Sequence, residues 1–287
     1  MKEMKDPGAY SNVEYVFEPH STALPDVRSY LAALWDRRPF MMELARSDLR
    51  TTRTSTALGS LWSVLDPLFQ GAIYFFLYTV IRGGGSGGKN QSFLPILIAG
   101  FFFFSLSLSA LGDAGQSIKR SKGLMLNSTF PRAMLPVTAV YKSLLKFIPM
   151  AGVLIVLFPL VGGKIGPGLL MLPLLFAIQI VMNVGIALLV STFVTLKPDG
   201  TNFMNYVNRV MFFATPVVYP VALLPARAKL IIGWQPLFPL FSCYQAVFGG
   251  GTPNPFLIIQ AAVWAVVLIV VGGNLFLRHE REFALHL

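Results

Sequence analysis

The stretch 256–277 has the sequence FLIIQAAVWAVVLIVVGGNLFL, which contains no charged residue. A helix needs about 20 mainly apolar residues to cross about 30 Å of hydrocarbon, so this stretch predicts a transmembrane helix. Five more apolar stretches precede it, at 58–81, 93–116, 141–161, 169–195 and 202–220. The pattern predicts an all-α polytopic membrane protein with six transmembrane helices. Lys142 and Lys146 lie in the first turns of the stretch 141–161, and we expect them to snorkel to the lipid head groups.

The composition supports a membrane protein and argues against a soluble enzyme. Of the 287 residues, 54% are hydrophobic and 13% are charged, whereas soluble domains carry about 25% charged residues. Eight of the 13 acidic residues lie in the first 48 positions and two in the last eight, which leaves Asp66, Asp113 and Asp199 between them. One cysteine, Cys243, and histidines only near the termini offer no metal site and no catalytic set. We therefore expect a chain that binds no metal and no cofactor.

The distribution of Lys and Arg predicts the orientation of the chain. Ten basic residues flank the spans on one side of the membrane and five on the other. The positive-inside rule places the richer side in the cytoplasm, and an even number of spans then puts both termini there. Residues 57–278 would span the membrane between a cytoplasmic segment, 1–38, whose first 34 residues show no helical period, and a cytoplasmic tail, 279–287. This orientation explains the basic excess without a nucleic-acid partner.

The segment 39–56 predicts an amphipathic helix before the first span. Arg46, Arg50 and Arg53 recur at i, i+4 and i+7 and so share one helical face. Such a helix is typical of the membrane interface, where the arginines meet the head groups. A solvated cytoplasmic helix is the alternative.

The loop between the fifth and sixth spans is expected on the outer side, yet it is rich in apolar residues. Two short apolar helices are predicted there, at 223–232 and 238–248, separated by Gly233–Pro236. Both are too short to span, so we expect helices that re-enter the outer leaflet within residues 222–250. An ordinary outer loop is the alternative, but it would be more polar.

The glycine-rich loop 83–90, GGGSGGKN, nearly matches a phosphate-binding loop. Its Gly83, Gly88 and Lys89 fit the pattern G-x-x-x-x-G-K, but Asn90 stands where a hydroxyl would hold Mg²⁺. No strand is predicted before it. We expect a flexible linker there, so any ATP would be hydrolysed by another subunit.

Four motifs in sequence order resemble one family. They are LGSLW at 58–62 followed by DPL at 66–68, FPRAMLP at 130–136, FFATPVVYP at 212–220, and Glu280 with Phe283 and Ala284. The chain resembles the permease subunits of bacterial polysaccharide-exporting ABC transporters, which are type-2 exporters of O-antigen, teichoic acid and galactan. It departs from the family pattern in the outer region, where Gln235-Pro236 and Tyr244-Gln245 replace Asn-Pro and Tyr-Arg.

The resemblance implies a homodimer of six-span subunits in the bacterial inner membrane. Each subunit would dock on a cytoplasmic ATPase, so that two ATPase copies bind ATP and Mg²⁺, and the cargo would be a polyprenyl-diphosphate-linked polysaccharide moving to the outer face. The segment 117–136 would carry ATPase motion into the membrane. The residues expected to do so are Lys119, Arg120, Lys122, Phe130, Pro131 and Arg132. The outer gate would include Trp234, Pro236, Tyr244 and Gln245.

Spans one and five line the channel in the family that the chain resembles. The candidate channel residues here are Trp62, Asp66, Phe75, Tyr78, Tyr206, Arg209, Phe213 and Tyr219. Aromatic faces can stack on sugars, but aromatic residues in spans also pack against lipid or other helices. Asp66 and Arg209 lie at similar predicted depths and are hypothesised to face the channel, with a structural ion pair as the alternative.

The arginines of the interface helix have two interpretations. Arg46, Arg50 and Arg53 are hypothesised to contact the lipid diphosphate, because guanidinium groups suit phosphate. Anchoring to anionic lipid is the alternative for these three residues. For the whole chain, the alternatives are a type-2 ABC permease for a drug or lipid, and a membrane-embedded enzyme that modifies lipids or glycans.

Overall fold

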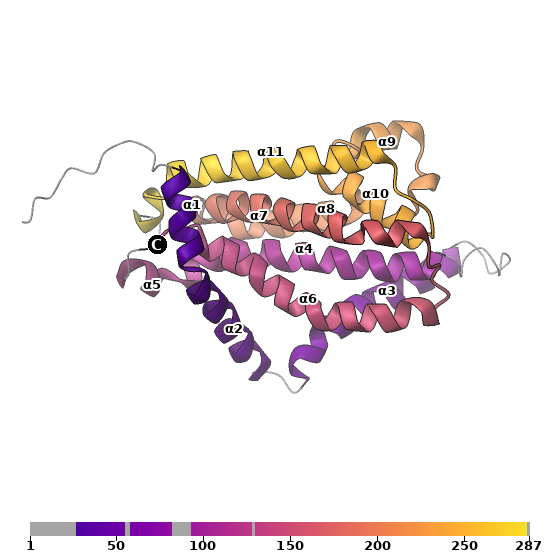
Figure 1. The fold of residues 1–287 in the computed structure, drawn as a ribbon, viewed down its shortest axis with the longest axis horizontal. Helices are drawn as coiled ribbons and strands as arrows, with labels where there is room; N and C mark the ends of the chain where they lie inside the picture. Colours follow the sequence, from indigo (N-terminus) through magenta and orange to yellow (C-terminus); the bar gives the residue numbers. More distant parts are fainter. Residues whose placement is uncertain (1–26, 55–57, 82–92, 128–129, 286–287) are drawn as a thin grey trace, which may run out of the picture.

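The computed structural model describes residues 27–54, 58–81, 93–127 and 130–285, and every regular element in these ranges is helical. Figure 1 shows the long helices of the chain side by side. They are α4 (Leu94–Arg120), α6 (Met134–Leu160), α7 (Leu172–Leu196) and α11 (Pro255–His279). These four are long and apolar enough to cross a membrane, with α7 extended to Pro167 by the short helix η3 (Pro167–Met171). Four of the six predicted spans are thus confirmed as helices of spanning length.

Two shorter helices stand where the first and fifth spans were predicted. They are α3 (Trp62–Ile81), which follows a short turn of helix, η1 (Gly59–Leu61), and α8 (Gly200–Ala214). The predicted fifth span, 202–220, is wrong at its end, because α8 stops at Ala214 and Thr215 is extended. Proline disfavours helical backbone in the residue before it, and Pro216 follows Thr215. The crossing of the membrane by α3 and α8 stays a prediction.

The core is centred on α4, the most buried of the four long helices, whereas α11 is the least buried. The rings of Phe103 and Tyr244 stack at 4.4 Å between centroids, and those of Phe147 and Phe176 stack at 5.5 Å. The backbones of α7 and α11 approach each other closely at Gly185. A Cβ atom on Gly185 would lie 2.5 Å from the carbonyl carbon of Leu268, so only glycine allows this separation of the two backbones.

Two helices precede the bundle. The predicted amphipathic helix is confirmed as α2 (Arg38–Thr54). The prediction that residues 1–34 have no helical period is wrong in part, because α1 (Val27–Asp36) is a helix. Tyr30 and Leu34 lie four residues apart on it, and both pack against a cluster from distant parts of the chain. That burial is a tertiary effect, and so the local sequence gave little indication of it.

Figure 1 places α1, α5 (Lys122–Asn127) and η5 (Glu282–Leu285) at one end of the bundle, and α9 (Ala226–Ile232) and α10 (Leu237–Phe248) at the other. The two short helices α9 and α10 lie close to their predicted positions, separated as predicted at Gly233–Pro236, and η4 (Val221–Leu223) leads into them. Ten of the twelve residues of α10 are buried, including Cys243, whereas no residue of α9 is. Their re-entry into a membrane is not tested, and the loop 83–90 lies outside the described residues.

Candidate functional site

The two shorter helices of the bundle each expose an apolar stripe. On α3 one row of exposed residues follows a spacing of four and three, namely Trp62, Asp66, Phe69, Ile73 and Phe76, and Gln70 and Ala72 beside it are also exposed. On α8 the exposed row is Phe203, Tyr206, Arg209, Val210 and Phe213, beside exposed Asn202 and Asn205. Residues spaced in this way lie on one side of a helix. Each helix therefore presents on the surface of the subunit a face that carries three exposed aromatic side chains and a single charge.

Except for Tyr219, the predicted channel residues whose side chains are described fall on these faces. Trp62, Tyr206 and Phe213 are exposed, while the side chains of Phe75 and Tyr78 lie outside the described residues. Tyr219 is partly buried. Its hydroxyl donates to the Phe213 carbonyl at 3.0 Å and to the Ala214 carbonyl at 3.2 Å. Its hydroxyl is therefore bonded to the end of α8.

Asp66 and Arg209 are both exposed, and the ion pairs among the described residues include none between them. The guanidinium of Arg209 instead lies 6.0 Å from the ring centroid of Tyr206. The hypothesis that both charges face a channel stays a prediction. Within one subunit, however, the two side chains do not meet.

A cluster of charges lies among α2, α4 and α6 that the sequence did not reveal. One oxygen of Asp113 lies 2.9 Å from Lys146 Nζ and 3.7 Å from Lys142 Nζ, and the other lies 3.8 Å from Arg120. Lys142 Nζ also lies 3.5 Å from Asp48 on α2. The lysine side chain of Lys142 is only 8% exposed. Both lysines were expected to snorkel, but they instead neutralise a carboxylate inside the bundle. The available signal was the i, i+4 spacing of the two lysines, with a lone aspartate on another span.

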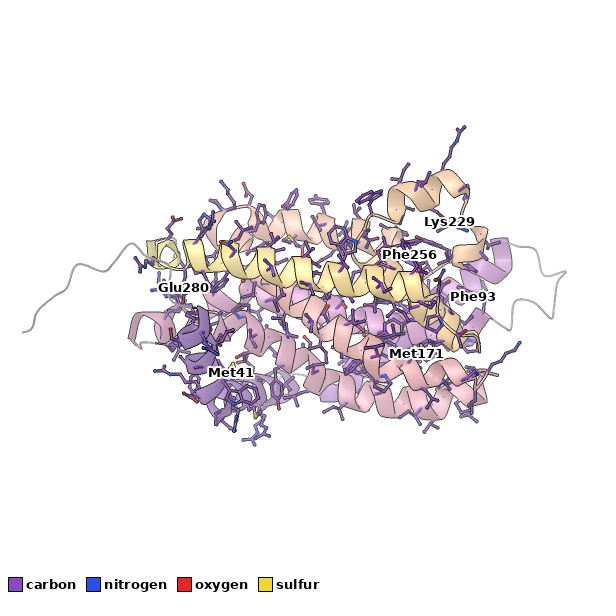
Figure 2. The ribbon with its side chains drawn as sticks, turned by 45° about the horizontal axis from the view of Figure 1, so that its top comes forward. Met41, Phe93, Met171, Lys229, Phe256 and Glu280 are labelled. Carbon is purple, nitrogen blue, oxygen red and sulfur yellow. The ribbon has the colours of Figure 1, made fainter. Side chains whose placement is uncertain are left out.

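The first helix, α1, and the C-terminal region around Glu280 both contact the segment 117–136. Figure 2 shows Glu280 at the opposite end of α11 from Phe256. Tyr30 of α1 donates its hydroxyl to the Glu280 carboxylate at 2.9 Å, and the backbone N–H of Arg132 donates to the same oxygen at 2.8 Å. Beside them Phe283 is fully buried, with its ring 5.1 Å from that of Phe276. The motifs FPRAMLP and Glu280 with Phe283 are thus one structural unit.

The other residues predicted to couple this segment to an ATPase differ in exposure. Arg120 and Lys122 are exposed, whereas Lys119, Phe130 and Pro131 are partly buried. Phe130 packs against the buried cluster that includes Phe276 and Phe283. Exposed Arg120 and Lys122 therefore belong to a segment that is anchored to the bundle by the packing of Phe130.

The interface arginines are exposed where they are described. The guanidinium of Arg46 lies 3.9 Å from the Glu43 carboxylate one turn away, and Arg50 is also exposed. The side chain of Arg53 lies outside the described residues. On an adjacent face of α2, Ala45 and Leu49 are buried. This arrangement agrees with the predicted amphipathic pattern.

At the other end, α10 is fixed by uncharged groups. The buried amide of Gln179 donates to the Phe103 carbonyl at 2.8 Å and to the Ser107 hydroxyl at 2.9 Å, and its oxygen accepts from the Tyr244 hydroxyl at 2.8 Å. Gln245, in the place of the family's arginine, donates to the Pro216 and Tyr219 carbonyls, both at 2.7 Å, and accepts from the Val221 N–H. Gln245 therefore binds the end of the FFATPVVYP motif to α10.

The remaining predicted gate residues are less enclosed. Pro236 is partly buried where α10 begins, and Trp234 is 77% exposed. Lys229, on α9, is exposed. The two halves of the predicted gate thus differ, since α10 is part of the core and α9 lies outside it. Among the described residues, no group of three or more acidic, histidine or cysteine side chains is placed to hold a metal ion.

Comparison with known proteins gives consistent matches. Residues 40–248 match a family described as ABC-2 type transporter. An O-antigen export system permease protein RfbA of Klebsiella pneumoniae is 25% identical over 247 residues, which cover 85% of this chain and 93% of that protein. The protein of the same name from Myxococcus xanthus is 23% identical over 254 residues, which cover 88% of this chain and 96% of that protein.

Proposed function

Because the chain belongs to the ABC-2 type transporter family, we propose that it is the membrane-spanning subunit of an ATP-driven exporter of polysaccharide. The relatives named for O-antigen export, which align over almost their whole length, support a polysaccharide as the cargo. The cargo would be linked to a polyprenyl diphosphate and would move from the cytoplasmic to the outer face of the inner membrane.

The observation that carries this proposal is the pair of exposed faces on α3 and α8. Each combines aromatic side chains with one charge, Asp66 or Arg209. A charge facing lipid near the middle of a span costs about 2.5–3.5 kcal/mol. These faces are therefore better covered by protein or by a polar path than by hydrocarbon. Two subunits that face each other through α3 and α8 would enclose a path lined by aromatic rings, on which sugars can slide.

The basic end of the bundle is the proposed docking side for a separate ATPase, one copy on each subunit of the homodimer and two copies in all. Exposed Arg120 and Lys122 stand there beside the buried cluster of Phe276 and Phe283. Since α1 and η5 lie at this same end (Figure 1), the positive-inside rule favours a cytoplasmic position for both. ATP and Mg²⁺ would bind to the partner, so the chain would be a transport subunit rather than an enzyme.

The exposed arginines of α2 are the proposed entry contact for the lipid diphosphate. Arg46 and Arg50 are exposed on this helix, and an adjacent face of the same helix is buried. A planar guanidinium binds two phosphate oxygens at once. Anionic head groups of the bilayer would compete for the same contacts.

Depletion of this subunit in its native cell tests the proposal. We expect lipid-linked polymer to accumulate in the cytoplasm while the outer surface loses it, and analysis of the extracted lipid would identify the glycan. Re-expression should restore export. Normal surface polysaccharide after depletion, together with altered efflux of a drug or lipid, would instead support a type-2 permease for that compound. Activity of the purified chain on a lipid or glycan without an ATPase would support a membrane enzyme.

A further inference from the structure

The start of α6 is held by side chains from both helical ends of the described chain. The N–H of Arg132 donates to Glu280, which is 148 residues away, and the N–H of Ala133 donates to the Tyr30 hydroxyl at 3.1 Å, which is 103 residues away. Ala133 caps α6 and has no side chain that could accept a hydrogen bond. Helices are usually capped by a nearby Ser, Thr, Asp or Asn. Here the capping groups come from α1 and from the end of α11.

These two bonds complete the backbone pairing of the whole turn. The N–H groups of Met134, Leu135 and Val137 donate to the Pro131, Arg132 and Ala133 carbonyls at 3.0, 3.1 and 3.2 Å. Pro136 has no N–H group. Every backbone donor from Arg132 to Val137 therefore has a partner, and the first two of these donors depend on Glu280 and Tyr30.

Glu280 is held in position by several hydrogen bonds. Its carboxylate accepts from Tyr30 and from the Arg132 N–H, and the Arg132 guanidinium donates to the backbone carbonyl of Glu280. Burial raises the pKa of Glu280, although the Arg132 N–H, the Tyr30 hydroxyl and nearby arginines act in the opposite direction. The start of a helix is a favourable place for such a carboxylate, because the helix dipole is positive there.

Farther along, α6 is bound to the interior charges. Lys142 and Lys146 lie about 12 and 18 Å along the helix from Met134, and both contact Asp113 of α4. One helix therefore connects the start of α6 to the charge cluster around Asp113 on α4. A displacement of the segment 117–136 can reach α4 through α6 only if the first turn of α6 does not unfold.

We propose that Tyr30 and Glu280 are positioning residues for export, which capture the first turn of α6 so that motion of the segment 117–136 passes into the membrane. This inference rests on the proposed function, because it requires an ATPase that moves that segment. The two residues touch neither nucleotide nor cargo. They act through the backbone of Arg132 and Ala133.

Two measurements on the full chain test the proposal. The first is amide hydrogen exchange of peptides covering residues 130–136, with the chain in lipid nanodiscs. The second is polymer exported per ATP hydrolysed by the complex with the ATPase that co-purifies with the chain. The variants are Tyr30→Phe, which removes one hydroxyl, Glu280→Ala, which removes the acceptor, and Glu280→Gln, which keeps an acceptor oxygen.

The controls are matched in chemistry. Tyr141→Phe removes a hydroxyl from α6 itself, and Glu282→Ala removes an exposed carboxylate two residues from Glu280. We expect Tyr30→Phe and Glu280→Ala to speed exchange of these amides about tenfold, as the loss of one hydrogen bond does. Export per ATP should fall severalfold while hydrolysis continues. Glu280→Gln should recover most of the export, and both controls should behave as wild type.

Each result bears on one claim. Export per ATP that stays at the wild-type value in Tyr30→Phe and Glu280→Ala would overturn the positioning role, whatever the exchange rates are. Equal losses of hydrolysis and export, in proportion to protein amount, would also overturn it, because they indicate a purely structural role. If the wild-type complex exports no polymer, the proposed function itself fails. If Glu280→Ala does not accumulate, Tyr30→Phe and Glu280→Gln decide the question.

Discussion

The two ends of the bundle are held together by different chemistry. At the end that carries α1 and η5, distant segments meet through charged side chains. The Glu280 carboxylate accepts from the backbone N–H of Arg132, and Asp113 pairs with Lys142 and Lys146. At the end that carries α10, the contacts are amide hydrogen bonds and stacked rings around Gln179 and Tyr244. Charged pairs are sensitive to the loss of one partner, whereas an aromatic core loses stability with the volume removed. The α10 end is therefore a fixed scaffold, whereas the contacts at the α1 end depend on charge.

The largest expected effect comes from disrupting the scaffold at the α10 end. Tyr244→Ala removes a ring that is 1% exposed and stacks on Phe103, together with the hydrogen bond to Gln179. We expect a loss of about 3–5 kcal/mol in unfolding free energy, measured as a fall in Tm of the detergent-solubilised chain. Trp234→Ala is the control, since that ring is 77% exposed, and it should change stability by less than about 0.5 kcal/mol. Equal effects of the two substitutions would contradict a fixed α10.

The second effect tests the charged end. Asp113→Asn leaves Lys142 and Lys146 without the negative charge that they share. Breaking a fully buried ion pair costs about 3–5 kcal/mol. Because the Asp113 side chain is 18% exposed, we expect a smaller loss of unfolding free energy, about 1–3 kcal/mol. Salt should reduce this difference only slightly.

The matched control for Asp113 is Glu43→Gln. It removes one partner of the exposed pair with Arg46, and exposed pairs contribute about 0–1 kcal/mol. A Tm unchanged in Asp113→Asn would show that the cluster does not contribute to stability.

The third effect concerns transport rather than folding. Asp66→Asn and Arg209→Gln alter exposed charges on α3 and α8, so Tm should stay within the range of surface substitutions, about 0.5 kcal/mol. If the charges face the channel, we expect export to fall about tenfold, which corresponds to about 1.4 kcal/mol. Exchanging the two residues should restore export if they pair between subunits. Normal export by both single variants and by the exchanged protein would exclude a role for these charges.

The smallest effect is a dependence of stability on pH. Burial raises the pKa of Glu280 above its usual value of 4.5. A carboxyl whose pKa is higher in the folded state contributes stability that is complete below the unfolded pKa and is lost as the pH rises through the folded pKa. Lowering the pH from 7 toward 5 should therefore raise Tm slightly through this group. Glu280→Gln cannot titrate at this position, so the variant should lack this rise in Tm between pH 7 and pH 5. The same change in Tm over this range in the wild type and the variant would contradict a raised pKa of Glu280.

The long helices could be predicted because the signal is local. About 20 mainly apolar residues are enough to identify a spanning helix, and α4, α6, α7 and α11 were found in this way. The resemblance drawn from four motifs is confirmed by the family match over residues 40–248. The end of α8 at Ala214 could also have been predicted, because Pro216 was visible in the sequence.

The contacts between distant segments could not be predicted. Tyr30 and Glu280 are separated by 250 residues, and neither has a local pattern that identifies a partner. α1 was missed for the same reason, since its buried face packs on segments near residues 130 and 280. The partners of Lys142 depended on which helices lie beside α6, and a single sequence does not contain that information. Asp66 and Arg209 were recognised as unusual charges, but their spacing along the chain did not determine whether they meet.

Cys243 has a practical consequence for experiments on this chain. It is the only cysteine in the sequence, and its thiol is completely buried within α10. A buried thiol reacts slowly with alkylating reagents. The natural chain is therefore already a suitable background for site-specific labelling, because one cysteine introduced at an exposed position would carry nearly all of the probe. A spin label or fluorophore on α9 and another on α1 could then report, without further engineering, how far the two ends of the molecule move during one transport cycle.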